Sequence, residues 1–389
     1  MPPDSEQLDV VVVGAGLAGT TLAGALARAG TRVALVDLHA TYPTDFRAEK
    51  FAAYEMAQFE ALGWGATARS CTTVTQAVHA VRFGRFAKLE PGREYGVAYA
   101  DLVGAFRADL PPAVALTIGR VSDLAFGPET QIVTLSDGRR LQARLVVLAT
   151  GLGDALRRKA GIERQMISRQ HSVALGFDMA APRGAFCFEA LHHAAERHGN
   201  RDAYLTLFPL GETMRANLFA YWDKQSPWLP AFKADPAKAL VDLMPGLPRF
   251  CPDLRIAGKV EIRPIDLIRV ADPVKEGFVL IGDAFQTACP VTGTGVRKLL
   301  TDVERLVHHV PHWLQTAGMG PDKTARYYAD ETKIRVDAES LRLSLYVRQL
   351  NTDARLPWSM RRGGRAIRNV LQIPRTLRAP WTRQGLAGL

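Results

Sequence analysis

DVVVVGAGLAG, residues 9–19, joins a short apolar run to the pattern Gly-x-Gly-x-x-Gly. Gly14 permits a tight turn, Gly16 lets the backbone approach a pyrophosphate, and Gly19 allows a helix to pack closely on the strand. The phosphates are expected at the positive amino end of that helix. The pattern therefore predicts a strand, turn and helix that bind a dinucleotide. The residues assigned to this contact are Gly14, Ala15, Gly16, Leu17, Ala18 and Gly19.

A second β-run, residues 31–36, ends at Asp37, eighteen residues after Gly19. An acid at this place accepts hydrogen bonds from a ribose hydroxyl. Three glycines alone also occur in purely structural turns. Strand, helix, second strand and terminal acid in this order favour the dinucleotide interpretation.

A second nucleotide-facing element follows far downstream. GFVLIGDAFQ, residues 277–286, reads as a buried strand that ends in Gly-Asp, and PVTGTG, residues 290–295, leads into a helical run over 296–310 with Asp302 in its second turn. A plain NAD domain has no need of such an element. An FAD domain does need one, because the ribityl chain and the flavin extend beyond the pyrophosphate.

At this point the chain resembles the class A FAD-dependent monooxygenases, the group of aromatic hydroxylases and ubiquinone-biosynthesis hydroxylases. The resemblance also includes Arg47, the hairpin over 132–149 that ends in Ala-Thr-Gly, and the strand pair 205–209 and 214–221. It implies non-covalent FAD. The further FAD contacts that it implies are Arg47, Val121, Gly151, Gly282, Asp283, Pro290, Gly293, Thr294 and Gly295.

The fold class that the resemblance implies is α/β. A Rossmann-type, glutathione-reductase-like FAD-binding domain is expected from residues 1–70, 100–165 and 265–325. A mostly antiparallel substrate domain is expected from 71–99 and 166–264, and a helical C-terminal region with a basic tail from 326–389.

The activity that the resemblance implies is hydroxylation of an aromatic or other electron-rich small molecule with O2 and NAD(P)H. No catalytic side chain is assigned, because the flavin carries the redox chemistry. The candidate substrate pocket comprises His171, Phe208, Phe219 and Tyr221. Three alternatives stay open: a flavin-dependent reductase of an isoprenoid double bond, a flavin halogenase, and a non-catalytic FAD-binding protein.

One departure from the family pattern concerns the electron donor. The family often has Asp-Gly-x-x-Ser-x-x-Arg after the hairpin, whereas TGLGDALR stands at residues 150–157, so that only Gly151 and Arg157 match. We therefore expect weak use of NADPH or a separate reductant. Arg157 is equally compatible with a solvated helix position.

Composition is typical of a folded cytoplasmic enzyme, with 389 residues of which 47% are hydrophobic. We find no secretion signal and no run of the ~20 apolar residues that span a bilayer. The four cysteines, Cys71, Cys187, Cys251 and Cys289, form no CxxC pair, so zinc and disulfide interpretations are disfavoured. No metal site is expected, and histidines other than His171 are expected at the surface or in packing, including His192-His193, His198, His308-His309 and His312.

The net charge of +10 lies largely in the tail. Residues 351–389 hold eight arginines against one acid, Asp353, a net charge of +7. Arg361, Arg365 and Arg368 have helical spacing, with Trp358 and other apolar residues on another face. A helix packed on the protein with solvated arginines is preferred to one on an anionic membrane. Nucleic-acid binding is disfavoured because no recognition module is present.

Overall fold

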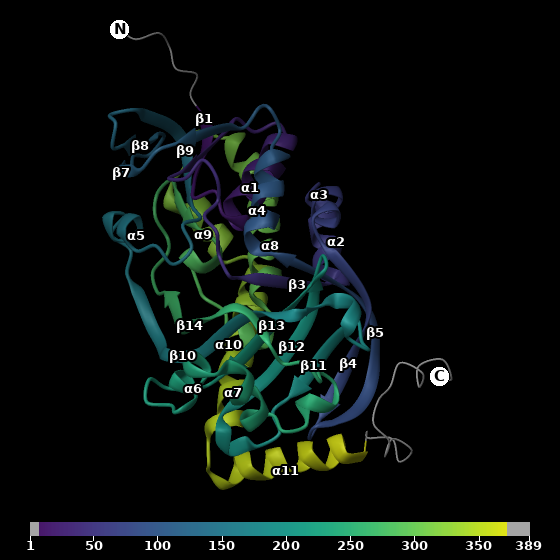
Figure 1. The fold of residues 1–389 in the computed structure, drawn as a ribbon. Helices are drawn as coiled ribbons and strands as arrows, with labels where there is room; N and C mark the ends of the chain where they lie inside the picture. Colours follow the sequence, from purple (N-terminus) through teal and green to yellow (C-terminus); the bar gives the residue numbers. More distant parts are fainter. Residues whose placement is uncertain (1–7, 372–389) are drawn as a thin grey trace.

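The structure is a computed structural model that describes residues 8–371, with side chains through residue 364. Two sheets form the body of the molecule, one above the other in Figure 1. The fold class expected from the sequence is confirmed: a Rossmann-type α/β unit, a largely antiparallel second sheet and a helical C-terminal part.

The upper, seven-stranded sheet has the order β6-β2-β1-β9-β8-β7, and β15 pairs with the carboxyl-terminal half of β9. Its strands at the centre are parallel and buried on both faces, which is why β1 and β2 are nearly continuous apolar runs. The bounds are β1 (Leu8–Val13), β2 (Val33–Asp37), β6 (Ala115–Ile118), β7 (Val121–Ala125), β8 (Gln131–Leu135), β9 (Arg140–Leu148) and β15 (Phe278–Leu280).

Helices cover one face of this sheet and share a single apolar core with it. They are α1 (Leu17–Arg28), α2 (Ala53–Ala61), α3 (Gly65–Ser70), α4 (Tyr99–Ala108) and α8 (Gly295–Leu314). Trp64 packs closely against α1, and its indole Nε1 donates a hydrogen bond to the Thr21 carbonyl at 3.0 Å. A Cβ on Gly24 would lie only 2.2 Å from the Trp64 ring, so glycine is required there.

The lower, eight-stranded sheet has the order β14-β10-β13-β12-β11-β4-β5-β3. All its neighbours are antiparallel except β11 and β4. The bounds are β3 (Ala48–Ala52), β4 (Thr73–Arg82), β5 (Arg85–Ala98), β10 (Arg164–Pro182), β11 (Ala190–Ala194), β12 (Asp202–Leu210), β13 (Thr213–Ala220) and β14 (Ile256–Val270). β3 pairs with β5 here, although residues 1–70 were expected in the FAD-binding domain.

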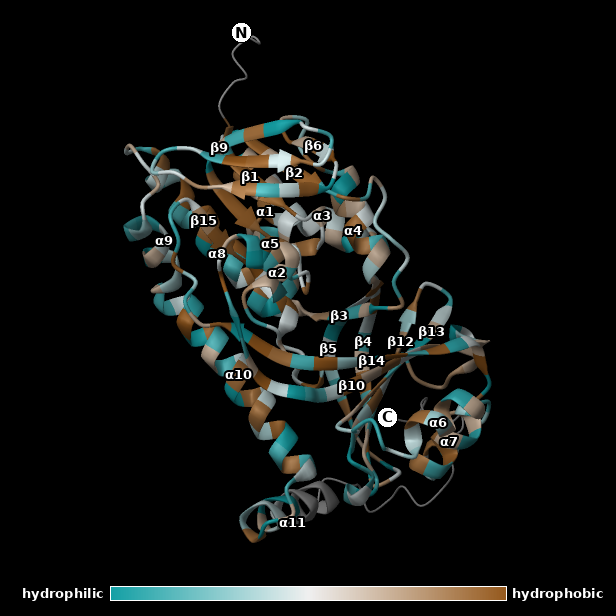
Figure 2. Ribbon diagram, turned by 90° about the vertical axis from the view of Figure 1, so that its left-hand side faces the viewer, coloured by the Kyte–Doolittle hydropathy of each residue, from teal (hydrophilic) through white to brown (hydrophobic). Residues whose placement is uncertain are grey.

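The two long strands β10 and β14 connect the layers, as the curved ribbons in Figure 2 show. Their pairing runs from Arg164 opposite Val270 to Met179 opposite Ile256. The helices α6 (Trp228–Ala234) and α7 (Pro236–Leu243) pack on the apolar face of this sheet. The opposite face of the sheet is thereby left to turn toward the nucleotide-binding unit.

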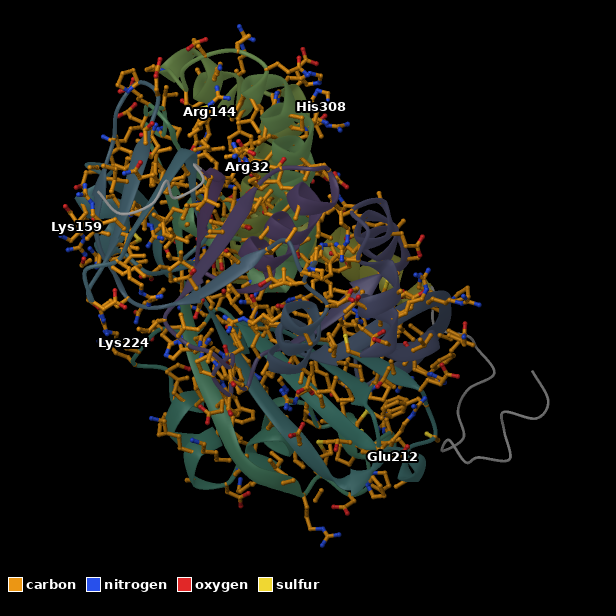
Figure 3. All side chains as sticks on the ribbon, turned by 90° about the horizontal axis from the view of Figure 1, so that it is seen from above. Arg32, Arg144, Lys159, Glu212, Lys224 and His308 are labelled. Carbon is orange, nitrogen blue, oxygen red and sulfur yellow. The ribbon has the colours of Figure 1, made fainter. Side chains whose placement is uncertain are left out.

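The C-terminal part consists of α9 (Pro321–Tyr328), α10 (Glu331–Thr352) and α11 (Leu356–Leu371). α10 starts at Asp330, whose carboxylate accepts from the amides of Thr332 and Lys333. α11 lies across the end of the molecule opposite β1 (Figure 1). Over the described residues, every helix is too short or too polar to cross a bilayer. Viewed from above, Lys159, Glu212 and Lys224 lie on the outside of the molecule (Figure 3).

Candidate functional site

The glycine-rich turn between β1 and α1 contains two glycines that packing requires and one that it leaves open. A Cβ on Gly19 would lie 1.8 Å from the Gly14 carbonyl oxygen, and one on Gly14 would lie 2.6 Å from the Ala149 carbonyl oxygen. At Gly16 the nearest atom is the Tyr99 hydroxyl, 3.7 Å away. α1 begins here without a side-chain cap and without an acid in its first turn. The turn therefore offers space and free amide groups to an anion.

Asp37, at the end of β2, fastens this turn. Its Oδ2 accepts from the Ala15 amide at 2.7 Å, and its Oδ1 accepts from the His39 amide at 2.8 Å. Arg107 on α4 lies 3.2 Å from the same carboxylate and donates to the Ala15 carbonyl at 2.7 Å. Sequence reasoning assigned Asp37 but missed Arg107, because no local pattern marks a residue 92 positions away from its partner.

Tyr99 was also missed. Its hydroxyl accepts from the Leu17 amide at 3.4 Å, at the start of α1. Arg47 lies over its ring, 4.2 Å from the centroid, and forms an ion pair with Glu49 at 2.7 Å. Burial raises the pKa of Tyr99 to about 12, which keeps the phenol neutral. Arg47 and Tyr99 thus form a cation–π pair between the glycine turn and the cavity described below.

The Gly282-Asp283 elbow follows β15 and is held by its backbone. Gly282 has φ +60°, its amide donates to Asp302 Oδ2 at 2.8 Å, and its carbonyl lies 3.4 Å from Lys298 Nζ. Asp283 is half-buried, and its carbonyl accepts from Arg164 at 3.3 Å. Because both polar groups of Gly282 are engaged, the backbone of the elbow is held in place.

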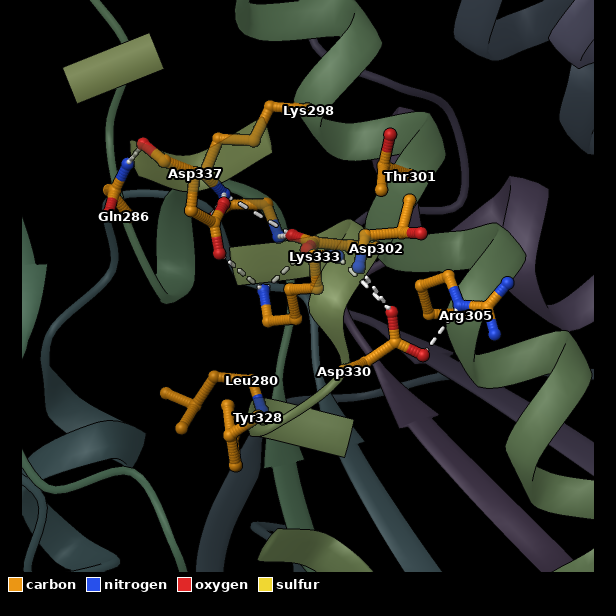
Figure 4. A network of polar contacts seen from close by, with 12 residues as sticks. Leu280, Gln286, Lys298, Thr301, Asp302, Arg305, Tyr328, Asp330, Lys333 and Asp337 are labelled. Atoms are coloured by element: carbon orange, nitrogen blue, oxygen red, sulfur yellow. Dashed lines mark hydrogen bonds and ion pairs between the residues drawn. The ribbon is translucent and has the colours of Figure 1, made fainter. Parts of the chain in front are cut away.

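Beneath this elbow lies a closed ring of four buried charges, which we call the charge ring: Lys298, Asp302, Lys333 and Asp337 (Figure 4). Lys333 contacts Asp302 at 2.6 Å and Asp337 at 3.0 Å, and Lys298 contacts the same two acids at 3.3 and 3.4 Å. Burial alone would raise the pKa of Asp302. The two lysines outweigh this effect and hold the pKa below its usual value, so that the carboxylate stays ionised. The ring joins α8, α10 and the elbow.

The loop over residues 290–295 is anchored to α10. Thr294 Oγ1 and Ser340 Oγ are 2.8 Å apart, and the Cys289 amide donates to Ser344 Oγ at 3.3 Å. Gly293 takes the left-handed conformation, φ +65°, and α8 then begins without a side-chain cap. Cys289 is fully buried, and burial raises the pKa of its thiol, so it is a packing residue rather than a nucleophile.

A cavity of about 980 Å³ lies between these loops and the lower sheet. One wall contains Arg47, Asp283 and the loop residues Pro290, Gly293 and Gly295. The opposite wall is the exposed face of β11, β12 and β13. Its side chains are His192, Tyr204, Thr206, Phe208, Asn217 and Phe219.

The sheet wall carries a row of three polar side chains in adjacent strands. Thr206 is the register partner of both His192 and Asn217. On one side of this polar row, the Tyr204 ring lies edge-on to His192, with centroids 4.5 Å apart, and tilted against Phe219, with centroids 5.1 Å apart. The Tyr204 hydroxyl also donates to the Val291 carbonyl at 3.0 Å, which links the sheet to the loop. The alternation of strand residues explains why these side chains share one face.

Two of the four predicted pocket residues, Phe208 and Phe219, line this cavity. His171 and Tyr221 do not line it, because both are buried behind the loop. His171 Nε2 lies 3.2 Å from the Ser344 carbonyl, and burial lowers its pKa to about 4. Tyr221 packs in one cluster with Cys289 and Val291. His192 was assigned to the surface or to packing, yet it lines the cavity.

Several of the remaining assigned residues lie outside this centre. Val121 begins β7 and pairs with Leu135, and the glycine turn and Asp37 are likewise not part of the cavity wall. Gly151 has φ +58°, and its carbonyl accepts from Arg164 at 3.0 Å. Arg157 is only 2% exposed and donates to Asp154, so the solvated interpretation is wrong. In residues 8–364, no three His, Cys, Asp or Glu side chains converge as metal ligands would.

Comparison with known proteins gives two results. A family model described as Lycopene cyclase protein matches residues 9–180. Among solved structures, p-nitrophenol 4-monooxygenase PnpA from Pseudomonas putida DLL-E4 has a TM-score of 0.72 at 15% identity, over 94% of this chain and 93% of that chain. PqsL from Pseudomonas aeruginosa, a probable FAD-dependent monooxygenase, has 0.71 at 18%, over 93% and 100%.

The Diels-Alderase PyrE3 also matches, with a TM-score of 0.69 at 17% identity, over 94% of this chain and 77% of that chain. The chain therefore has the fold of FAD-dependent monooxygenases, and that fold also carries a different reaction. The reaction of this chain has to be argued from its own site.

Proposed function

We propose that this protein is an FAD-dependent monooxygenase that hydroxylates an aromatic or other electron-rich small molecule. One observation carries the proposal: the Gly282-Asp283 elbow and the 290–295 loop face an aromatic sheet across one cavity. A nucleotide site alone would not require that second wall. A cavity of this volume is large enough for a flavin ring and a small substrate together.

The residues present fit FAD. Gly16 leaves room where a pyrophosphate approaches, and the amino end of α1 has no competing acid. Asp37 retains partial exposure, with 15% of its side chain accessible, for a ribose hydroxyl. Arg47 and Asp283 then extend the contact toward the cavity, where both line the wall. FAD bound here supplies the redox chemistry with O2.

The chain's own contribution is binding, orientation and exclusion of water. The uncapped amino end of α8 and the glycines of the 290–295 loop favour negative charge at the loop wall. Tyr204 and Phe219 offer ring faces to a planar substrate, since aromatic pairs prefer offset or edge contacts. The polar row then favours substrates with hydroxyl, amino or carbonyl substituents, because such groups can hydrogen-bond to its side chains.

For the electron donor we propose NAD(P)H, used weakly, or a separate reductant. Asp154 is occupied by Arg157 at 3.0 Å and Arg158 at 3.2 Å, and it also contacts Arg164. These three arginines therefore share one carboxylate, which already engages part of their hydrogen-bonding groups. A phosphate of NADPH would have to compete with Asp154 for them.

The first experiment tests FAD binding with two matched variants. Gly16→Ala and Gly104→Ala both add a methyl group where the protein has room for it. Only the former blocks approach of a pyrophosphate, so only Gly16→Ala is expected to weaken FAD binding in an absorbance titration. Asp283→Ala should weaken it by about 10- to 150-fold, the worth of one charge-assisted hydrogen bond. A wild-type protein that gains no flavin absorbance would refute the cofactor.

The second experiment tests the reaction with labelled dioxygen and a panel of simple phenols and anilines. Substrate should accelerate NAD(P)H oxidation, or oxidation of a chemical reductant, and one labelled oxygen atom should enter the product. A product without label, formed equally well without air, would contradict hydroxylation. A flavin that is reduced under no condition would favour a non-catalytic FAD-binding protein.

A second candidate is a flavin-dependent reductase of an isoprenoid double bond. The match of residues 9–180 to the Lycopene cyclase protein model favours it. The polar row on the sheet wall disfavours it, because an isoprenoid chain would place apolar surface against three polar side chains. The same labelled-oxygen assay, run with a prenylated quinone, separates the two candidates.

A further inference from the structure

α11 turns apolar side chains toward solvent. Leu356 is 72% exposed and Met360 is 68% exposed, the largest values among the exposed apolar residues described. The two are four positions apart, so they lie on one face of the helix. Gly363 and Gly364, one turn further on, are exposed as well. A helix that belonged only to the core of this protein would bury this face.

The opposite face of α11 is attached to the protein. The ring of Trp358 lies 5.6 Å from that of Tyr346 on α10. Arg362 donates to the carbonyl of Asp353 at 2.6 Å and to that of Leu350 at 3.2 Å. Positions two residues apart in a helix lie about 200° apart. Because the side chains of Trp358 and Arg362 face the protein, those of Leu356 and Met360 face the solvent.

Positive charge accompanies this apolar face. Arg361 is exposed and lies over the Trp358 ring at 4.7 Å. Residues 354–389 contain eight arginines and no acid, and Asp353 is already paired with Arg355. In the sequence, Ile367 and Leu371 follow Met360 by seven and eleven positions, a spacing typical of one helical stripe.

We propose that α11 is a membrane-surface helix that docks on anionic lipid. Leu356 and Met360 would enter the boundary between headgroups and acyl chains, while arginines contact the anionic headgroups. A second copy of this chain fits the face less well, because a symmetric contact would bring a net charge of +7 against another +7. The helix lies at the end of the molecule opposite β1, where it can reach a flat surface (Figure 1).

The test uses the full-length protein and sedimentation with two kinds of vesicle, phosphatidylcholine alone and phosphatidylcholine with phosphatidylglycerol. We expect binding to the anionic vesicles only. Binding should weaken as salt shortens the Debye length from ~10 Å at 0.1 M toward ~3 Å at 1 M. Leu356→Glu and Met360→Glu should each weaken binding by about tenfold or more, since each removes a buried apolar side chain from lipid.

The matched control is Ile334→Glu on α10, where the side chain is 51% exposed but lies outside α11. It should bind vesicles like the wild type. Thermal unfolding and FAD titration of all variants show whether the fold is intact. The proposal fails if the wild type does not sediment with anionic vesicles, or if Ile334→Glu loses binding equally. It also fails if light scattering shows a dimer that Met360→Glu dissociates while vesicle binding is absent, which would identify a second copy as the occupant.

Discussion

Asp302 in the nucleotide-binding unit and Asp202 in the sheet unit are equally buried, at 0% and 1% exposure, but their surroundings are opposite. Asp302 contacts two lysines and the Gly282 amide. Neither oxygen of Asp202 receives a hydrogen bond from another described residue. Burial lies behind the raised pKa of Asp202, about 7, whereas the lysines hold that of Asp302 below its usual value.

The difference shows what each unit is built to hold. The charge ring anchors the backbone of the elbow that carries Asp283. In the sheet unit, Asp202 is buried without such compensation from other described residues, and it does not line the cavity. The first arrangement needs full internal compensation, because a buried charge without a partner is strongly destabilising. Asp202 avoids the same cost by protonation, because its raised pKa, about 7, keeps the carboxyl largely neutral at lower pH.

The largest effect is expected for Lys333→Met. Removing this lysine leaves Asp302 and Asp337 with one cation between them, and breaking a buried pair costs about 3 to 5 kcal/mol. Urea unfolding measures the loss, and FAD affinity should fall with it because the elbow loses its support. Lys88→Met, at an exposed ion pair with Glu90, is the control and should change stability by less than about 1 kcal/mol. If both variants lose the same free energy of unfolding, the buried charge ring is no more important for stability than an exposed ion pair.

An intermediate effect of opposite sign is expected for Asp202→Asn. The folded-state pKa, about 7, lies above the ordinary value of 3.8, so wild-type stability falls as pH rises through this interval. The asparagine side chain of the variant does not titrate, so the variant does not lose stability with rising pH for this reason. Its advantage over the wild type should be smallest near pH 4 and reach about 1 to 3 kcal/mol at pH 7.5, the cost of a buried unpaired polar group.

The measurement is thermal or urea unfolding of both proteins across that pH range. Asp123→Asn provides the comparison at an exposed acid, whose side chain is 64% accessible, and should show no such trend. A variant that is less stable than the wild type at pH 7.5 would mean that Asp202 has a partner.

The smallest effect is expected for Tyr204→Phe. It removes only the hydrogen bond to the Val291 carbonyl and should cost about 0.5 to 1.5 kcal/mol in unfolding. Phe219→Tyr is the control on the same wall, because it keeps the aromatic surface. If the bond orients the loop, Tyr204→Phe should alter the flavin spectrum of the loaded protein, and Phe219→Tyr should not. If the flavin spectra of both variants match that of the wild type, the hydrogen bond from Tyr204 to Val291 supports the fold without orienting the loop at the flavin.

The sequence predicted the parts of the site that depend on neighbours in the chain. Gly14, Gly19 and Asp37 act through short-range geometry, and the Gly282-Asp283 turn likewise follows directly from its strand. Arg107 and Tyr99 escaped prediction because their partners are 92 and 82 residues away. His192 escaped it because its role depends on the register of β11 against β12, and a shift of one residue would have buried it on the other face.

His171 and Tyr221 show the converse error. Both lie on strands of the lower sheet or at its end, but their side chains turn away from the cavity, toward Ser344 and Cys289. Alternation along a strand decides this, and the sequence gives no fixed point from which to count it.

The strand pair β10 and β14 has a mechanical consequence. With 19 and 15 residues, these strands are far longer than the usual 3 to 10, and they run from the upper layer across the lower one. Their register shifts three times, between Met166 and Ser168, between Ser168 and Ser172, and between Gly176 and Asp178. A register shift of this kind bends a strand and increases its local twist. Because residues of both strands line the cavity, the places where this ribbon bends help to determine the shape of the space between the two walls.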